Sequence, residues 1–320
     1  MNPMKDAPRR GFTLADLCVL IAIVVLVAAA MLPSASHLGH GASRAKCSNN
    51  LRQIALAAQM YAYAEPDGSF PRTVYDGIGG APTVYTGVQA PNPFGPGAPG
   101  PNDVTAALYL LLRTQEITHD AFICPSSPAE RWDFAGRGPM AFSNFPGRQY
   151  VSYSYANPFP TKAAVGSGWR FDVRLGSNAP LAGDMNSGMP ALLTTPYTAS
   201  ARQMAAVNSP NHNGEGQNVV FCDAHVEWQT TTPYCGVPLK DQPFRDNVYT
   251  AGLGTGTVVS GAPTDYPDMV LLPAYGDGPQ PPPWKKAKAF PGLIAFIGAG
   301  VLLFVAGLIV AILARRSART

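Results

Sequence analysis

Two long apolar segments, one near each end of the chain, constrain its fold more than any other feature. The first, Phe12–Leu32, contains a single charged residue, Asp16. The second, Leu293–Ala314, is 22 residues long and contains none. A helix needs about 20 apolar residues to cross the roughly 30 Å hydrocarbon core of a bilayer. We therefore expect two transmembrane helices, with residues 34–289 between them.

Flanking charges predict the orientation of these helices. Lys5, Arg9 and Arg10 precede the first segment, which favours a cytoplasmic N-terminus by the positive-inside rule. Two crossings then return the basic tail to the cytoplasm and place residues 34–289 on the other side. That interval carries 17 Lys and Arg against 18 Asp and Glu, a net charge of −1. A net charge so close to zero does not predict the basic surface that nucleic-acid binding requires.

A distinctive motif lies at the start of the first apolar segment. The run Arg9–Asp16 reads Arg-Arg-Gly-Phe-Thr-Leu-Ala-Asp and resembles the class III signal of type IV prepilins. The resemblance implies that prepilin peptidase cleaves after Gly11 and methylates the new N-terminus, Phe12. It also implies that Asp16, where the family usually has Glu, pairs with the free amine during assembly, since an unpaired charge in a membrane is costly. The alternative is a secretory signal cleaved near Ser34–Ser36, although such signals have apolar regions of only about 7–15 residues.

Further motifs extend the similarity into the region between the apolar segments. They are CSNNLRQI at 47–54, ICPS at 123–126 and the block at 211–226. They are similar to a bacterial family of prepilin-signal proteins of unknown function, which is marked by His, nine residues, then Asp-Gly. Here ten residues separate His212 from Asp223, and Ala224 stands where the family has Gly. The similarity covers about residues 9–250.

This resemblance implies a pseudopilin-like protein in the inner membrane of a bacterium. Its expected partners are the membrane, prepilin peptidase, and other pseudopilins or a second copy through the N-terminal helix.

Apolar residues continue at helical spacing after Pro33 until Glu65-Pro66-Asp67-Gly68 stops them. The expected parts are a leader (1–11), a transmembrane helix (12–33), its exterior continuation (34–65), a loop-rich α+β head (66–250), a Pro/Gly-rich linker (251–289), a second transmembrane helix (290–314) and a cytoplasmic tail (315–320).

Within the head, the expected fold is α+β, with the long pilin-like helix packed on a small antiparallel sheet. A helix is predicted at 103–116, with Asn102 or Asp103 as its N-cap. The strand candidates are 122–124, 150–155, 181–184 and a hairpin of 218–222 with 225–229. A two-residue hairpin loop, Asp223-Ala224, would pair Phe221 with Val226.

Five cysteines indicate where covalent links can form. Cys18 lies in the first apolar segment, whereas Cys47, Cys124, Cys222 and Cys235 lie in the exterior region, where disulfides persist. Four cysteines allow three connectivities. We favour Cys47–Cys124, which would tie the long helix to the head, together with Cys222–Cys235.

A zinc site is the alternative to the second disulfide. The predicted hairpin makes Cys222 and His225 cross-strand neighbours. With His212 and Cys235 they would form a Cys2His2 ligand set, although their spacing matches no common zinc motif.

Calcium is a further alternative, because related pseudopilin heads bind it in their C-terminal loops. Asp184, Asn186 and Asp223 have the oxygen atoms that Ca²⁺ prefers. Their spacing is not that of an EF-hand loop, and Asp and Asn are also common turn residues.

The sequence contains no Gly-x-Ser-x-Gly, His-Glu-x-x-His or phosphate-binding Gly loop. We therefore expect a non-enzymatic protein without a cofactor, associated with type II secretion or a pilus-like assembly. Since a second apolar segment would hold it in the bilayer, we expect an initiator, a cap or another anchored envelope protein. The alternative is a membrane-tethered module that binds a ligand or Ca²⁺. A hydrolase would require a defined site near His212 and Asp223.

Overall fold

A computed structural model of the chain describes residues 14–230, 233–240 and 242–277. These residues combine a few helices with a small antiparallel sheet, which confirms the α+β class. The expected leader, the second apolar segment and the tail lie outside the described residues. Among the residues described, no helix is long and apolar enough to cross a membrane.

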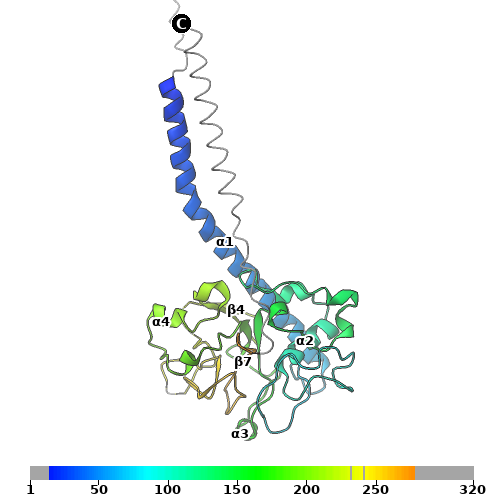
Figure 1. Cartoon of the computed structure of the whole chain (residues 1–320). Helices are drawn as coiled ribbons and strands as arrows, with labels where there is room; N and C mark the ends of the chain where they lie inside the picture. Colours follow the sequence, from blue (N-terminus) through cyan, green and yellow to red (C-terminus); the bar gives the residue numbers. More distant parts are fainter. Residues whose placement is uncertain (1–13, 231–232, 241, 278–320) are drawn as a thin grey trace, which may run out of the picture. The chain divides into compact units, whose positions relative to one another are not determined.

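The first helix, α1, runs from Leu14 to Ala64 and continues through Pro33 (Figure 1). From Cys47 onward one of its faces is buried, and that face includes Leu51 and Ile54, as the apolar spacing predicts. This face packs mainly against strand β3, with β2 and β4 also in contact. The two predicted pieces of the N-terminal helix therefore form one continuous element.

The main sheet has five antiparallel strands in the order β4-β3-β2-β1-β7. Every residue of β1, β2 and β3 is buried, so these three strands are covered on both faces, whereas the edge strand β4 is partly exposed. A separate two-stranded sheet pairs β5 with β6. The strand bounds are β1 Tyr153–Ala156, β2 Pro180–Asp184, β3 Gln217–Phe221, β4 Val226–Gln229, β5 Thr250–Ala251, β6 Val258–Val259 and β7 Leu271–Leu272.

The remaining helices are short. The helix predicted at 103–116 is α2, and the Asp103 side chain caps it by accepting a 2.8 Å hydrogen bond from Ala106 N. The strand predicted at 122–124 is wrong, because η1 extends to Phe122 and a backbone hydrogen bond from Ile123 to Asp120 closes its last turn. The bounds are α2 Val104–Thr114, α3 Lys162–Gly166, α4 Ala201–Ala205, η1 His119–Phe122, η2 Phe134–Gly136, η3 Pro139–Ala141, η4 Arg148–Tyr150, η5 Pro190–Leu193 and η6 Asn211–Gly214.

The β3–β4 hairpin forms, but its register differs from the prediction by one residue. Phe221 and His225 flank a three-residue loop, and Val226 lies opposite Val220 rather than Phe221. The loop ends at Ala224, whose φ of 67° is left-handed. This is the usual geometry of a three-residue hairpin loop, in which a residue with positive φ follows a type I turn.

The expected linker is wrong for residues 251–277, which belong to the head. The apolar run 269–272 is buried, and β7 within it pairs with β1 at the edge of the sheet. A two-residue strand is too short to show a periodic pattern, and Pro and Gly residues surround it, so the sequence does not reveal it.

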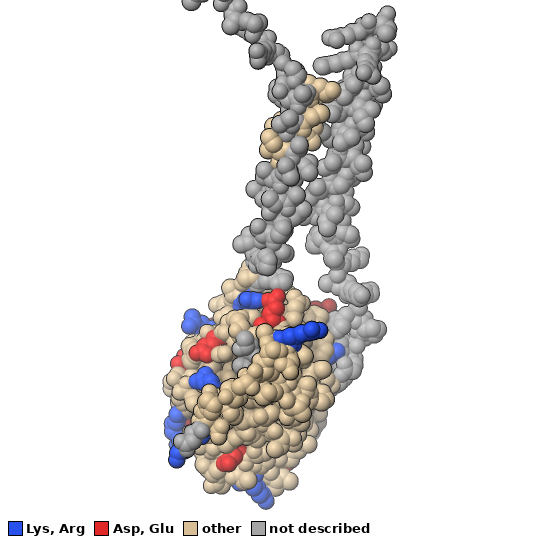
Figure 2. All heavy atoms as spheres, turned by 90° about the vertical axis from the view of Figure 1, so that its left-hand side faces the viewer, with Lys and Arg blue, Asp and Glu red and all other residues tan. Residues whose placement is uncertain are grey.

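On the face in Figure 2, acidic and basic side chains are scattered among uncharged ones.

Two buried carboxylates lie in this C-terminal part of the head. Asp246 accepts a hydrogen bond from Gly254 N and Asp268 accepts one from Gly252 N, yet one oxygen of each carboxylate has no hydrogen-bond partner among the residues that the structure describes. Burial, followed by the charge of Asp268, raises the pKa of Asp246 well above its usual range. Burial likewise raises the pKa of Asp268. Both groups therefore destabilise the folded state when they ionise.

Replacing Asp246 with Asn is expected to stabilise the protein at pH 7 by about 1–3 kcal/mol, because Asn cannot ionise, whereas burial in the folded state opposes the ionisation that Asp246 undergoes in the unfolded chain. The pKa of Asp246 is higher in the folded state than in the unfolded chain, where it is about 3.9. The wild type therefore loses stability as the pH rises from the unfolded-state pKa to the folded-state pKa. The gain from D246N should shrink as pH falls toward about 4. Thermal melts of the wild type and of D246N at pH values from about 4 to 7 measure this gain, and replacement of the exposed Glu116 with Gln is the control. A gain that is independent of pH would contradict this assignment.

Candidate functional site

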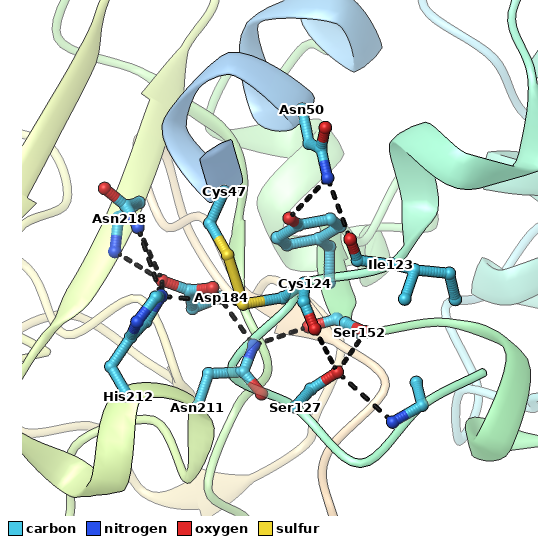
Figure 3. Close-up of a disulfide and its surroundings, with 12 residues drawn as sticks. Cys47, Asn50, Ile123, Cys124, Ser127, Ser152, Asp184, Asn211, His212 and Asn218 are labelled. Carbon is cyan, nitrogen blue, oxygen red and sulfur yellow. Dashed lines mark hydrogen bonds and ion pairs between the residues drawn. A yellow bond between two sulfur atoms is a disulfide. The ribbon is translucent and has the colours of Figure 1, made fainter. Parts of the chain in front are cut away.

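Polar residues from separate parts of the chain meet beneath α1 (Figure 3). They come from α1, β2, β3, η6 and the segment after η1. None is more than 5% exposed, so each polar group needs a partner within the protein. This buried cluster consists of Cys47, Cys124, Asp184, Asn211, His212 and Asn218.

The disulfide predicted between Cys47 and Cys124 is confirmed. Their Cα atoms are 5.2 Å apart, within the range of native disulfides. It joins α1 to a segment 77 positions later in the chain. Ser127 holds that segment in a turn, because its backbone N–H and its hydroxyl both donate to the Cys124 carbonyl, at 3.0 and 2.8 Å.

Asp184, at the end of β2, organises the polar side of the cluster. Its Oδ2 accepts hydrogen bonds from the backbone N–H and the side-chain amide of Asn218, at 2.7 and 3.0 Å. Its Oδ1 accepts a third, of 3.0 Å, from the amide of Asn211. The same amide donates to the Ser152 carbonyl at 2.8 Å. A carboxylate without exposed surface is therefore held by three donors in a fixed orientation.

His212 lies between this carboxylate and the disulfide. Its Nε2 is 3.4 Å from Asp184 Oδ2 and 3.6 Å from Cys124 Sγ. The ring also meets the Trp228 ring edge-on, with centroids 5.3 Å apart. The backbone of His212 is left-handed, with φ 54° and ψ 31°, a conformation that costs about 1–2 kcal/mol for most residues. Surrounding contacts therefore hold His212 in this place against a local preference.

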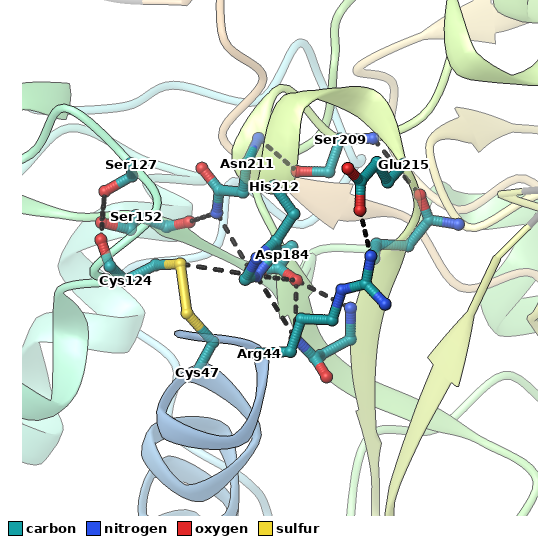
Figure 4. A network of polar contacts seen from close by, with 12 residues as sticks. Arg44, Cys47, Cys124, Ser127, Ser152, Asp184, Ser209, Asn211, His212 and Glu215 are labelled. Carbon is teal, nitrogen blue, oxygen red and sulfur yellow. Dashed lines mark hydrogen bonds and ion pairs between the residues drawn. A yellow bond between two sulfur atoms is a disulfide. The ribbon is translucent and has the colours of Figure 1, made fainter. Parts of the chain in front are cut away.

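Arg44 of α1 lies at the rim of the cluster (Figure 4). Its guanidinium forms an ion pair with Glu215, which follows η6, and lies 4.2 Å from the centre of the Trp228 ring. Since Trp228 also contacts His212, Arg44 connects the helix to the cluster from the side opposite the disulfide.

Three more polar side chains of α1 donate to backbone carbonyls of the head. Asn50 bonds the Ile123 carbonyl at 2.8 Å, Arg52 bonds that of Ala224 at 3.2 Å, and Gln59 bonds that of Cys222 at 2.7 Å. Together with the disulfide, these contacts fix both the rotation and the axial position of α1 on the head.

The second predicted disulfide, Cys222–Cys235, is not formed, because both residues are buried free thiols. Their charged neighbours differ. The neighbour with the largest effect on the pKa of Cys222 is Asp223, whereas for Cys235 it is Arg245. Burial raises the pKa of both thiols, so they stay protonated and unreactive at neutral pH.

The zinc set predicted from the sequence is also not assembled. The Nδ1 of His225 contacts the Asp223 carboxylate, and its Nε2 lies 3.5 Å from Glu227. Its ring stacks on Phe221 at 4.4 Å, which is a consequence of the changed hairpin register. His212 belongs to the buried cluster instead.

The three oxygen donors suggested for Ca²⁺ have different partners. Asp184 belongs to the buried cluster. The amide of Asn186 donates to the carbonyls of Tyr249 and Leu271, at 3.1 and 3.0 Å. Asp223 is half exposed in the hairpin loop. These three residues therefore do not form a common site.

The residues that resemble a prepilin signal are only partly described. Gly11 and Phe12 lie outside the described residues, and Asp16 lies within α1. The sequence reasoning missed Arg44 and Asn218. Asn218 carries a signal that could have been used, because it is a polar residue beside the apolar run of a buried strand. Arg44 has no such signal.

Comparison with protein-family models, curated proteins and solved structures finds no match to this chain.

Proposed function

We propose that the chain is a non-enzymatic, pseudopilin-like protein of the bacterial cell envelope. It is processed by prepilin peptidase, and it uses the N-terminal part of α1 to associate with the membrane and with other pseudopilin-like helices or a second copy. The setting would be a type II secretion-like or type IV pilus-like assembly.

The observation that carries this proposal is the uncovered apolar surface at the start of α1. Leu14, Leu20, Ile23 and Val24 are between 51% and 60% exposed, whereas Leu51 of the same helix is fully buried. Apolar side chains exposed together favour burial in lipid or against another helix. At 51 residues, α1 is about 75 Å long, enough to support a head at one end and an assembly at the other.

The continuity of α1 favours prepilin processing over a secretory signal. Cleavage near Ser34–Ser36 would cut α1 between its exposed apolar part and its buried part, since the helix runs from Leu14 to Ala64. Cleavage after Gly11 leaves the helix whole. The resemblance to prepilins assigns the pairing with the new amine at Phe12 to Asp16.

The buried cluster supports a mechanical role in this function. Because the disulfide and the polar side chains of α1 hold the helix on the sheet, the position of the helix determines the position of the head. A second apolar segment, 293–314, would resist extraction from the bilayer, so we propose an initiator or cap rather than a repeating filament subunit. Recovery of the protein along sheared filaments would contradict this part.

Mass spectrometry of the intact protein from native membranes tests the proposal. The expected chain begins at N-methyl-Phe12 and still ends at Thr320. Replacing Gly11 with Val should leave a chain that begins at Met1. The matched control is Gly41→Val in α1, where an added Cβ meets no atom within 4 Å, and this variant should be processed normally. A wild-type chain that begins at Met1 or near Ser36 would overturn the proposal.

A further inference from the structure

The buried cluster contains four potential metal ligands of three chemical kinds. One ligand atom each from Cys47, Cys124, Asp184 and His212 lies within 4.8 Å of the others, and all four residues are buried. Zinc binds Cys sulfur at about 2.3 Å and His nitrogen or carboxylate oxygen at about 2.0–2.2 Å. In a tetrahedron these bonds place ligand atoms about 3.3–3.8 Å apart. The cluster is therefore close to the size of a zinc site.

In the oxidised protein the two sulfurs are joined to each other, and metals bind the thiolate rather than the disulfide. We propose that reduction of the Cys47–Cys124 disulfide converts the cluster into a Zn²⁺ site with Cys47, Cys124, His212 and Asp184 as ligands. The reductant is a dithiol, which gives two electrons and two protons to the S–S bond and becomes a disulfide itself. Zn²⁺ then displaces one proton from each thiol.

The surroundings of the ligands support this assignment. The Nε2 of His212 faces both Asp184 Oδ2, at 3.4 Å, and Cys124 Sγ, at 3.6 Å. One nitrogen thus already points at the position that the metal would occupy (Figure 3). Asn211 and Asn218 orient the carboxylate, as outer residues commonly do around metal ligands.

A second observation is the strained backbone beneath the histidine. His212 and Asn213 both have positive φ, of 54° and 59°. Strain of this kind is characteristic of sites that hold a side chain for a task. The disulfide forms between the two cysteines without His212, whereas the proposed Zn²⁺ site needs His212 as a ligand. The zinc would also restore the link between α1 and the head in the state in which the disulfide is open.

The test uses the full-length chain in detergent, in a variant that removes the other thiols, Cys18→Ala, Cys222→Ala and Cys235→Ala. This protein is reduced with a phosphine and refolded with Zn²⁺ or Co²⁺ under anaerobic conditions. We expect one metal per chain by elemental analysis, and a thiolate-to-cobalt charge-transfer band with the intense visible bands of tetrahedral Co²⁺. The oxidised protein should bind none. Failure of the reduced protein to bind, or equal binding by the oxidised protein, would overturn the proposal.

Substitution tests the ligand set. His212→Gln should weaken Zn²⁺ binding by at least about 10–100-fold, the effect of losing even an outer-shell partner, whereas His225→Gln, outside the cluster, should not change it. Equal affinity in H212Q would exclude His212 as a ligand. Alkylation of the reduced wild type needs no variant: Zn²⁺ should protect Cys47 and Cys124, whereas the labelling of Cys18, which lies outside the cluster, should not depend on Zn²⁺. Labelling that is independent of Zn²⁺ would contradict the site even if H212Q failed to fold.

Discussion

Replacing Cys47 and Cys124 together with Ala is expected to lower the free energy of unfolding of the oxidised protein by about 4 kcal/mol. The disulfide spans 77 positions, and a cross-link over such a distance removes much of the conformational entropy of the unfolded chain. Both side chains are also fully buried. Urea unfolding followed by circular dichroism measures the difference.

The matched control is Cys222→Ala, which removes a buried thiol without removing a cross-link. Its expected cost is about 1 kcal/mol, from lost packing. Reduction of the wild type in the presence of a chelator should reproduce most of the loss in the double variant. A double variant no less stable than the control would show that the disulfide does not hold α1 on the head.

Replacing Asp184 with Ala is expected to cost about 3–5 kcal/mol, the range for removing one partner from a buried polar pair. The variant would leave the backbone N–H and amide of Asn218 and the amide of Asn211 without their acceptor. Each buried donor without a partner costs about 1–3 kcal/mol. Thermal and urea unfolding measure the loss, and the yield of folded protein gives a second measure.

Two variants calibrate this prediction. Asp184→Asn keeps the shape and one acceptor oxygen, so it should lose roughly half as much as the Ala variant. Asp223→Ala removes a half-exposed carboxylate that pairs with His225, and such surface pairs contribute about 0–1 kcal/mol. If D184A and D223A cost the same, the network around Asp184 is not the stabilising element that its geometry indicates.

Predictions that relied on local pattern were the most successful. The helix α2 and its cap at Asp103 follow from a capping residue before an apolar stretch. The buried face of α1 at Leu51 and Ile54 follows from helical spacing. The α+β class is likewise confirmed. Each of these depends on residues that are close together in the sequence.

Predictions that required distant segments to be placed were less successful. The hairpin was found, but its loop has three residues, and Ala224 takes the left-handed position that closes such a loop. The additional loop residue places Trp228 opposite Asn218 and His225 opposite Phe221. The zinc set built on the expected register was lost as a result.

The sequence by itself determined the apolar segments and the buried face of the long helix, because composition and periodicity carry this information. It also favoured the Cys47–Cys124 disulfide, which ties this helix to the head. Only the tertiary structure decided that Asp184 and His212 meet beside the Cys47–Cys124 disulfide, and that the run at 269–272 joins the sheet. Such contacts depend on how segments that are distant in the sequence pack together, and the residue spacing within a single segment does not specify this packing. The candidate site is therefore a product of packing, whereas the proposed membrane association is a product of composition.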